Sequence, residues 1–301
     1  MNFKDWLNHW LNNYVKTCCK RRTFEVYSAT VENRIVPYIG ERNLDELTPQ
    51  FLQEFVNTLV SPEGPALAPN TVNGVITVLQ SSLKMAYEMG YVPTYEGDKI
   101  RHPRPIEKKV ESLTTLEQKK IETHIRNCDR YKLYGIVICM YTGLRLGELL
   151  ALKWKNVDMH KAQIVVESTC YYVNNKRIID SPKTSQSLRT IPFPRQILAL
   201  FRVLKKHAKS DFVIEENGNP VSNRSMQRSF ELVQRKLDIE PKGFHSLRHT
   251  FATRALECGM DVKTLSEILG HTNPNVTLRR YAHSMLEHKQ QMMNRLGRIY
   301  G

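Results

Sequence analysis

The sequence lacks the patterns that mark a metal site, a disulfide framework or a membrane anchor. Its six cysteines form no CxxC pair and no cysteine–histidine cluster at zinc spacing. A Walker phosphate loop and an acidic metal cluster are also missing. The longest uncharged apolar run, Leu133–Leu144, is too short to span a bilayer, and Lys4 and Asp5 precede any apolar run, unlike a secretory signal. We therefore expect a cytoplasmic chain with reduced thiols, no cofactor, no metal and no membrane.

Acidic residues are too few to balance the basic ones. Against 44 Lys and Arg stand 30 Asp and Glu, which gives a formal net charge of +14. Such a surplus raises both the affinity for phosphate backbones and the rate of encounter with them. A generically basic protein remains the alternative at this point. The length of 301 residues, 41% of them hydrophobic, allows two ordinary domains with a core in each.

The first 96 residues show apolar side chains at helical spacing. The stripes predict a bundle of about four helices, at residues 3–14, 23–36, 49–59 and 68–89. Lys20-Arg21-Arg22 lies between the first two, and the fourth carries polar residues along one side: Asn73, Thr77, Ser81 and Lys84. A solvated surface explains either feature alone; together with the motifs below they favour a DNA-contacting face.

Residues 97–111 contain prolines among basic residues and few apolar ones, which is typical of a linker. Beyond them, helical patterns from Thr114 are interrupted by runs of β-branched residues at 163–173, 177–179 and 189–193. We expect a mainly α chain with a small antiparallel β-sheet, in which Lys183 occupies the loop between the last two strands.

The stretch from Gly243 to His283 organises the chain around a few polar side chains. A helix starting near Ser246 places two of them one turn apart, and a second helix, capped by Asp261, ends at Gly270. A third helix is expected from Asn273-Pro274. The polar side chains brought together are His245, Arg248, His271 and Tyr281.

These residues form motifs that closely resemble those of the tyrosine recombinase family, the integrases of phages and conjugative transposons. The pieces are His245-Ser-Leu-Arg248, Leu269-Gly270-His271 and Tyr281, with an upstream match at residues 142–149 that contains Arg145. The resemblance implies the catalytic residues Arg145, Lys183, His245, Arg248, His271 and Tyr281. It also implies a helical core-type DNA-binding domain at residues 1–96, a basic linker at 97–111, a mixed α+β catalytic domain at 112–283 and a tail at 284–301 that is exchanged between subunits or folds back on its own domain.

The chemistry of these side chains suits the opening of a phosphodiester. Arg145 and Arg248 can bind phosphate oxygens bidentately, and His245 can help to take the proton from the Tyr281 phenol. The resemblance implies a 3′-phosphotyrosine and a free 5′-hydroxyl, reached without metal or ATP, with Lys183 as the acid for the leaving oxygen. Glu148 matches an acidic position of the motif and is expected to orient its neighbours.

The resemblance also implies partners. They are double-stranded DNA recombination sites, three further copies of the chain in a homotetramer on DNA, and an accessory DNA-bending or directionality protein; the protein would be nucleoid-associated when bound. The chain is expected to lack an N-terminal arm-binding domain. Two other functions stay open: a type IB topoisomerase with the same chemistry, and a non-catalytic DNA-binding accessory protein.

Overall fold

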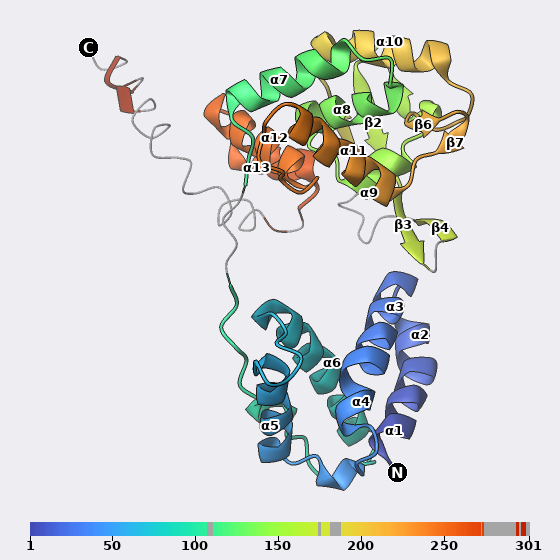
Figure 1. Cartoon of the computed structure of the whole chain (residues 1–301), viewed down its shortest axis with the longest axis vertical. Coiled ribbons are helices and arrows are strands. Elements are labelled where there is room, and N and C mark those ends of the chain that lie inside the picture. Colours follow the sequence, from blue (N-terminus) through green and yellow to red (C-terminus); the bar gives the residue numbers. More distant parts are fainter. Residues whose placement is uncertain are drawn as a thin grey trace. The chain divides into compact units, whose positions relative to one another are not determined.

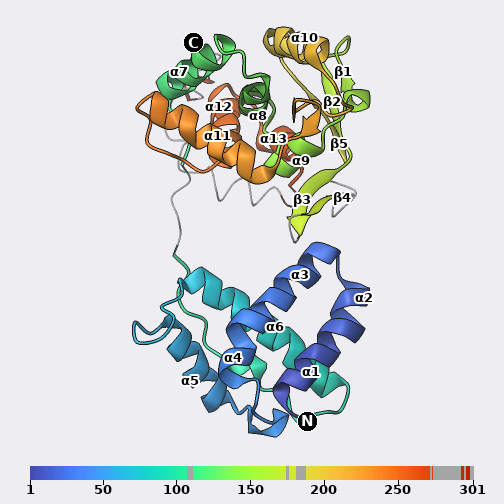
Figure 2. The same ribbon diagram turned by 45° about the vertical axis from the view of Figure 1, so that its right-hand side comes forward.

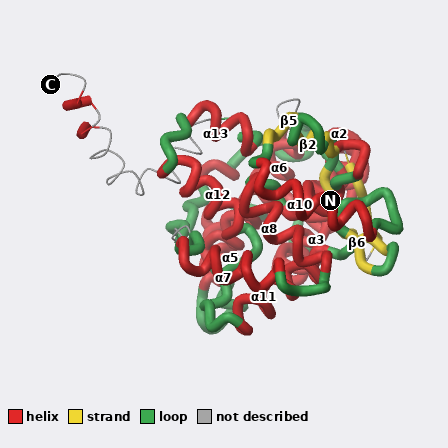
Figure 3. The backbone as a smooth tube through the Cα atoms, turned by 90° about the horizontal axis from the view of Figure 1, so that it is seen from above, coloured by secondary structure: helices red, strands yellow, loops and turns green. Residues whose placement is uncertain are grey.

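The computed structural model describes residues 1–106, 111–173, 176–180, 188–271, 273, 293–294 and 296–298 (Figure 1). The chain divides into two compact units between Lys108 and Lys109. They are called the N-terminal and the C-terminal unit below and are described separately. Helices predominate over strands (Figure 3), and among the described residues no helix is long and apolar enough to cross a membrane.

The N-terminal unit is a bundle of helices, as the apolar stripes predict (Figure 2). Each of its first two helical segments, residues 3–18 and 21–39, contains one π-helical turn, and its last two helices begin at prolines. The hydroxyl of Thr48 caps the helix that begins at Pro49, because it accepts a hydrogen bond from the backbone N–H of Phe51. The elements are α1 (Phe3–Trp10), η1 (Leu11–Val15) and α2 (Lys16–Cys18), then α3 (Arg21–Thr30), η2 (Val31–Ile35) and α4 (Val36–Ile39), and finally η3 (Leu44–Glu46), α5 (Pro49–Val60) and α6 (Pro69–Glu88).

Aromatic and aliphatic side chains fill the centre of this unit. Trp6 is fully buried, and its indole N–H donates to the carbonyl of Ser82 on α6 at 3.2 Å. Burial of one such large side chain contributes about 1.5–3 kcal/mol. Other large, fully buried side chains of this core come from all four helical segments of the bundle: Phe3, Leu7, Ile35, Leu52, Leu59, Ile76 and Leu79.

The segment expected to be a linker is in part attached to the N-terminal unit. Residues 97–99 form the short helix η4 (Gly97–Lys99), and Ile100, 3% exposed, joins the core. Amide side chains of α6 donate to carbonyls of the segment: Gln80 to Gly97 at 3.1 Å, Asn73 to Pro103 at 3.1 Å and Asn70 to Ile106 at 3.2 Å. The side chain of Asn73 thus binds the chain's own backbone, and residues 97–106 are attached to the N-terminal unit instead of forming a flexible linker.

The C-terminal unit combines helices with short strands. Its first helix begins with the capping box of Thr114 and Glu117. The helices are α7 (Thr115–Arg126), η5 (Tyr131–Leu133), α8 (Tyr134–Thr142), α9 (Leu146–Ala151), η6 (Trp154–Asn156), η8 (Arg195–Ile197), α10 (Leu198–His207), α11 (Asn223–Lys236), α12 (Ser246–Glu257) and α13 (Val262–Leu269).

The strands are antiparallel throughout and form three small sheets among the described residues. They are β1 (Val157–Asp158), β2 (Gln163–Val166), β3 (Thr169–Val173), β4 (Lys176–Asp180), β5 (Arg189–Pro192), β6 (Glu215–Glu216) and β7 (Asn219–Pro220). Their orders are β1-β2-β5, β3-β4 and β6-β7. The run expected as one strand, 163–173, is two, because β2 pairs with β5 and β3 pairs with β4. The loop with Lys183 lies outside the described residues.

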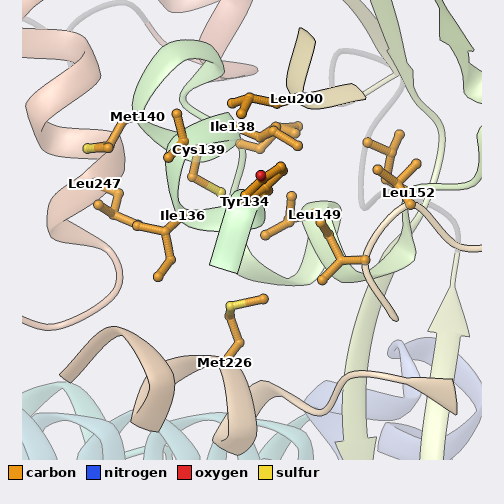
Figure 4. Close-up of a cluster of buried hydrophobic side chains, with 14 of the residues drawn as sticks. Tyr134, Ile136, Ile138, Cys139, Met140, Leu149, Leu152, Leu200, Met226 and Leu247 are labelled. Atoms are coloured by element: carbon orange, nitrogen blue, oxygen red, sulfur yellow. The ribbon is translucent and has the colours of Figure 1, made fainter. Parts of the chain in front are cut away.

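Helix α8 forms the centre of the C-terminal core (Figure 4). Eight of its nine residues are buried, namely Tyr134–Met140 and Thr142, as expected of a helix covered on nearly all sides. Side chains of the surrounding helices close around it: Leu149 from α9, Leu200 from α10, Met226 from α11 and Leu247 from α12. The turn that leads from α8 into α9 is therefore attached to a helix that is packed tightly in the core.

Gly143 ends α8 in a left-handed conformation, with φ of 66°. A Cβ atom there would lie 2.5 Å from Cδ1 of Phe251 and 2.9 Å from Cδ2 of Leu269. We predict that Gly143→Ala lowers the free energy of unfolding by about 2–5 kcal/mol, from backbone strain and overpacking together. Urea denaturation measures this.

Gly259 provides the matched control for Gly143. It also has a positive φ, 88°, but a Cβ there would meet nothing within 4 Å. Gly259→Ala should therefore cost only the backbone term, about 1–2 kcal/mol. Equal losses for the two variants would show that the contacts of Phe251 and Leu269 with residue 143 do not matter.

Candidate active site

The turn after α8 places Arg145 at the N-terminus of α9. Arg145 is extended, with ψ of 150°, and its backbone N–H donates to Oε2 of Glu148 at 2.8 Å. Its guanidinium donates to Oε1 of the same carboxylate at 2.8 Å. The Arg145 side chain is 37% exposed, whereas Glu148 is 6% exposed. Glu148 thus holds Arg145 from inside the protein, and the Arg145 side chain remains partly exposed.

A second arginine, Arg189 at the start of β5, binds the other side of Glu148. Its two terminal nitrogens donate to Oε1 and Oε2 at 3.1 and 2.9 Å, and its side chain is only 6% exposed. Sequence reasoning missed this residue. Two signals were available: the alternation in β5 puts Arg189 on the same inward face as buried Ile191, and an acid among the leucines of α9 requires a buried cation.

The two arginines set the ionisation of Glu148. Burial alone would raise the pKa of this carboxyl, but the hydrogen bonds and charge of Arg189, with the charge of Arg145, lower its pKa to about 2. Glu148 is therefore a carboxylate at any physiological pH. The thiol of Cys139, buried beside this group, has its pKa raised by burial and by the Glu148 charge, and it stays neutral.

Because the pKa of Glu148 is depressed in the folded protein, its contribution to stability is present above the ordinary pKa of 4.5 and is lost as the pH falls towards about 2. We predict that the difference in free energy of unfolding between the wild-type protein and Glu148→Gln is largest near about pH 6 and narrows below about pH 4.5. Urea titrations at several pH values measure it, with the same change at exposed Glu63 as control. A gap that stays constant with pH would contradict the ion pair.

Arg248 lies on the first turn of α12 and is 2% exposed. Its guanidinium donates to the carbonyl of Gly143 at 2.9 Å and to that of Leu269 at 2.6 Å. Strong backbone acceptors thus compensate for much of the cost of burying the charge. The Leu269 carbonyl belongs to the C-terminal end of α13, where the helix dipole favours a cation.

The end of α13 is surrounded by arginines. Asp261 caps the start of this helix, and Gly270, with φ of 64°, stops it, as predicted from the sequence. The last carbonyls accept from three different guanidinium groups: Ile268 from Arg189 at 2.6 Å, Leu269 from Arg145 at 3.2 Å and from Arg248 at 2.6 Å, and Gly270 from Arg145 at 3.3 Å. Arg145 and Arg248 therefore meet at one oxygen, that of Leu269.

The two predicted histidines flank this arrangement. His245 is exposed at the N-terminus of α12, one turn before Arg248, and its ring stands perpendicular to that of His249 with centroids 4.6 Å apart. His271 follows Gly270 directly, is half-buried, and donates its backbone N–H to Ser266 at 3.0 Å. The other two predicted site residues, Lys183 and Tyr281, lie outside the described residues, as does the third helix expected from Asn273-Pro274.

Each unit has a groove with basic side chains in its lining, together with one glutamate: Glu231 in the C-terminal unit and Glu25 in the N-terminal unit. In the C-terminal unit the groove runs beside α11 and reaches Phe244, the residue before His245; its lining includes Arg224, Gln227, Arg228, Arg235 and Lys242. In the N-terminal unit a groove between α3 and α6 is lined by Arg22, Asn33, Arg34, Thr71, Gly74 and Thr77, among others. Within the described residues, no group of three or more His, Cys, Asp or Glu could hold a metal ion.

Comparison with known proteins identifies the family. The model of the phage integrase family matches residues 109–288, and that of the phage integrase N-terminal SAM-like domain matches residues 2–60. A tyrosine recombinase XerC-like protein of Caldanaerobacter subterraneus subsp. tengcongensis is 25% identical over 98% of this chain and 83% of its own length.

Solved structures share the fold over nearly the whole chain. A Tn1549 transposon integrase in complex with transposon right end DNA aligns with a TM-score of 0.84 and 22% identity, over 99% of this chain and 100% of that chain. A lambda integrase tetramer bound to a Holliday junction aligns with a TM-score of 0.69 and 18% identity, over 91% of this chain and 78% of that chain. Because the first family match alone spans more than half of the sequence, the chain belongs to the phage integrase family and is a DNA strand-transferring tyrosine recombinase.

Proposed function

We propose that this enzyme is a site-specific integrase that cuts and rejoins DNA through a 3′-phosphotyrosine at Tyr281, without metal or ATP. The observation that carries the proposal is the meeting of Arg145 and Arg248 at the end of α13, directly before His271. These are the motif residues whose charges suit a scissile phosphate, and they come from separate parts of the chain. The Arg145 side chain is partly exposed, and the burial of Arg248 keeps its charge poorly screened by water.

In the proposed reaction the Tyr281 oxygen forms a bond to phosphorus, and the bond from phosphorus to the 5′ oxygen breaks. A tyrosine with an ordinary pKa of about 10 is neutral at physiological pH, so its proton must pass to a base, for which exposed His245 is the candidate. The arginines stabilise the charge that builds on the non-bridging oxygens. The phosphate ester is conserved in the tyrosine adduct, so another 5′-hydroxyl can reverse the step.

Lys183 is the proposed acid for the departing 5′ oxygen. We predict that Lys183→Ala slows cleavage of an ordinary duplex by about 10²–10⁴-fold, the usual contribution of general acid catalysis. A duplex with sulfur in place of that 5′ oxygen should be cleaved by the variant at close to the wild-type rate, because a thiolate leaves without protonation. Single-turnover cleavage assays compare the two duplexes. Lys183 is not the acid if the sulfur duplex gives no rescue.

The proposed substrate is a pair of duplex recombination sites. The groove along α11 reaches Phe244, the residue before His245, and its arginines and Lys242 are suited to hold a phosphate backbone close in sequence to the proposed base. In the N-terminal unit, the groove between α3 and α6 combines arginines with small polar side chains, a composition suited to phosphate contact and base reading. By analogy with the lambda integrase solved as a tetramer on a Holliday junction, we propose a homotetramer on DNA. An accessory DNA-bending or directionality protein remains part of the proposal.

Recombination of two plasmids tests this function. The DNA that flanks the gene is first sequenced for an inverted repeat with a short central spacer, and a copy of this candidate site is placed on each of the two plasmids. A chelator is present throughout. Strand exchange confined to these sites supports the integrase. Relaxation of a supercoiled plasmid that lacks the sites, without exchange, would instead identify a topoisomerase-like enzyme, and DNA binding with neither reaction would identify a non-catalytic accessory protein.

A further inference from the structure

Arg189 has no role in the chemistry proposed above, yet its side chain lies between the elements that carry the site. From β5 it bonds to Glu148 on α9 and to the carbonyl of Ile268 on α13. The side chain is 6% exposed, and it packs against Gly270, where an added Cβ would lie 3.0 Å from a terminal nitrogen of Arg189. The guanidinium group of Arg189 is therefore held in place by its contacts with Glu148, Ile268 and Gly270.

One carboxylate serves both arginines. Oε1 of Glu148 accepts from Arg189 at 3.1 Å and from Arg145 at 2.8 Å. Oε2 accepts from Arg189 at 2.9 Å and from the backbone N–H of Arg145 at 2.8 Å. Because a bidentate pair fixes the carboxylate plane, the orientation of Arg189 is passed on through Glu148 to Arg145.

The charges explain why a second arginine is needed. Glu148 is almost completely buried, and a buried carboxylate requires a cation. If Arg145 had to meet this need alone, the attraction would draw its fork inward, away from the exposed side where a phosphate could bind. With Arg189 as the dedicated partner, Arg145 keeps a net positive charge and part of its surface open.

We propose that Arg189 is a positioning residue for DNA cleavage, acting on Arg145 through Glu148 and on the segment that leads to His271 through the end of α13. This inference rests on the proposed function. In the sequence, Arg189 also follows closely on the loop that contains Lys183. The side chain of Arg189 thus contacts the stretches that supply the proposed phosphate clamp and histidine, and in the sequence it follows the stretch that supplies the proposed acid.

The test compares two nicked duplexes that trap the cleaved product and differ only at the scissile phosphate. One has an ordinary phosphate, and the other has a methylphosphonate, in which a methyl group replaces a charged oxygen. Arg189→Met should cleave the ordinary duplex about 10²-fold more slowly than the wild-type protein, as expected for a displaced catalytic group. Its loss on the methylphosphonate should be at least severalfold smaller, because an uncharged group has less need of Arg145. Arg189→Lys, which keeps the charge, should fall between.

Arg177 on β4, the strand that precedes β5 in the sequence but belongs to another sheet, is the matched control. It is half-buried and bonds to the carbonyl of Leu150 at 2.5 Å, without an ion pair to Glu148 among the described contacts. Arg177→Met should change the two cleavage rates by the same factor. Thermal unfolding reports the folded fraction of each variant, and where Arg189→Met does not fold, Arg189→Lys and Glu148→Gln decide.

Two results would overturn the inference alone. In one, the Arg189 variants cleave the ordinary duplex at the wild-type rate. In the other, they lose the same factor on both duplexes, which would indicate a purely structural role. If the wild-type protein cuts neither duplex, the proposed function fails and this inference fails with it.

Discussion

Replacing Tyr281 by phenylalanine is expected to abolish the covalent protein–DNA complex and to leave DNA binding at its normal strength. The change removes only the phenolic oxygen, which is the proposed nucleophile, and keeps the ring. No other group in the proposed mechanism can make the bond to phosphorus. Incubation with a nicked duplex followed by denaturing electrophoresis measures the complex, and a gel shift measures the binding.

Tyr300 supplies a control for this change, since it lies in the same C-terminal part of the sequence but outside the motifs. Tyr300→Phe should form the complex at the wild-type level. A denaturant-stable complex with Tyr281→Phe would remove Tyr281 from its proposed role.

Arg145→Ala is expected to slow cleavage by about 10²–10³-fold, the usual cost of removing a donor aimed at transition-state charge. DNA binding should fall much less, because the chain has many other basic side chains that can bind the phosphate backbone of DNA. Arg126→Ala is a close match as control: Arg126 is 35% exposed, against 37% for Arg145, and it too pairs with a glutamate of its own helix, Glu122 at 2.7 Å. Single-turnover cleavage rates measured at saturating protein distinguish a loss of cleavage from a loss of DNA binding. Equal losses for both variants would mean that Arg145 acts only through general charge or folding.

The helices could be predicted from the sequence because their signals are local. Thr48-Pro49 starts α5, and Asp261 and Gly270 bound α13, each through a contact within a few residues. Strand pairing is not local. The run of residues 163–173 has one continuous β pattern, and only the tertiary structure reveals that its two halves join different partners.

The attachment of residues 97–106 to the N-terminal unit was hidden by composition. A stretch rich in proline and basic residues resembles a linker, and its one strong apolar anchor, Ile100, carries little weight in such a pattern. What fixes the stretch is a set of amide side chains of α6 that donate to its carbonyls, such as Gln80 to Gly97. Hydrogen bonds between side chains and backbone groups that are distant in the sequence produce no periodic pattern of residues.

The site could be predicted as far as its motifs extend. The motifs gave Arg145, Arg248 and the two histidines, and the structure brings the two arginines to one carbonyl oxygen, that of Leu269. The catalytic roles of these residues remain predictions. Arg189 could not be found from motifs, because its partner Glu148 is far away in the sequence and the contact depends on how β5 approaches α9.

The most direct measurement is the identification of the amino acid and the DNA end that are joined in the covalent complex. The wild-type protein is trapped on a nicked duplex in the presence of a metal chelator, and the digested complex is sequenced by mass spectrometry. We predict a peptide that contains Tyr281, joined to a 3′ phosphate, with a free 5′-hydroxyl on the released strand. A link through another residue, a link to the 5′ end, or cleavage without any covalent protein would contradict the proposed mechanism.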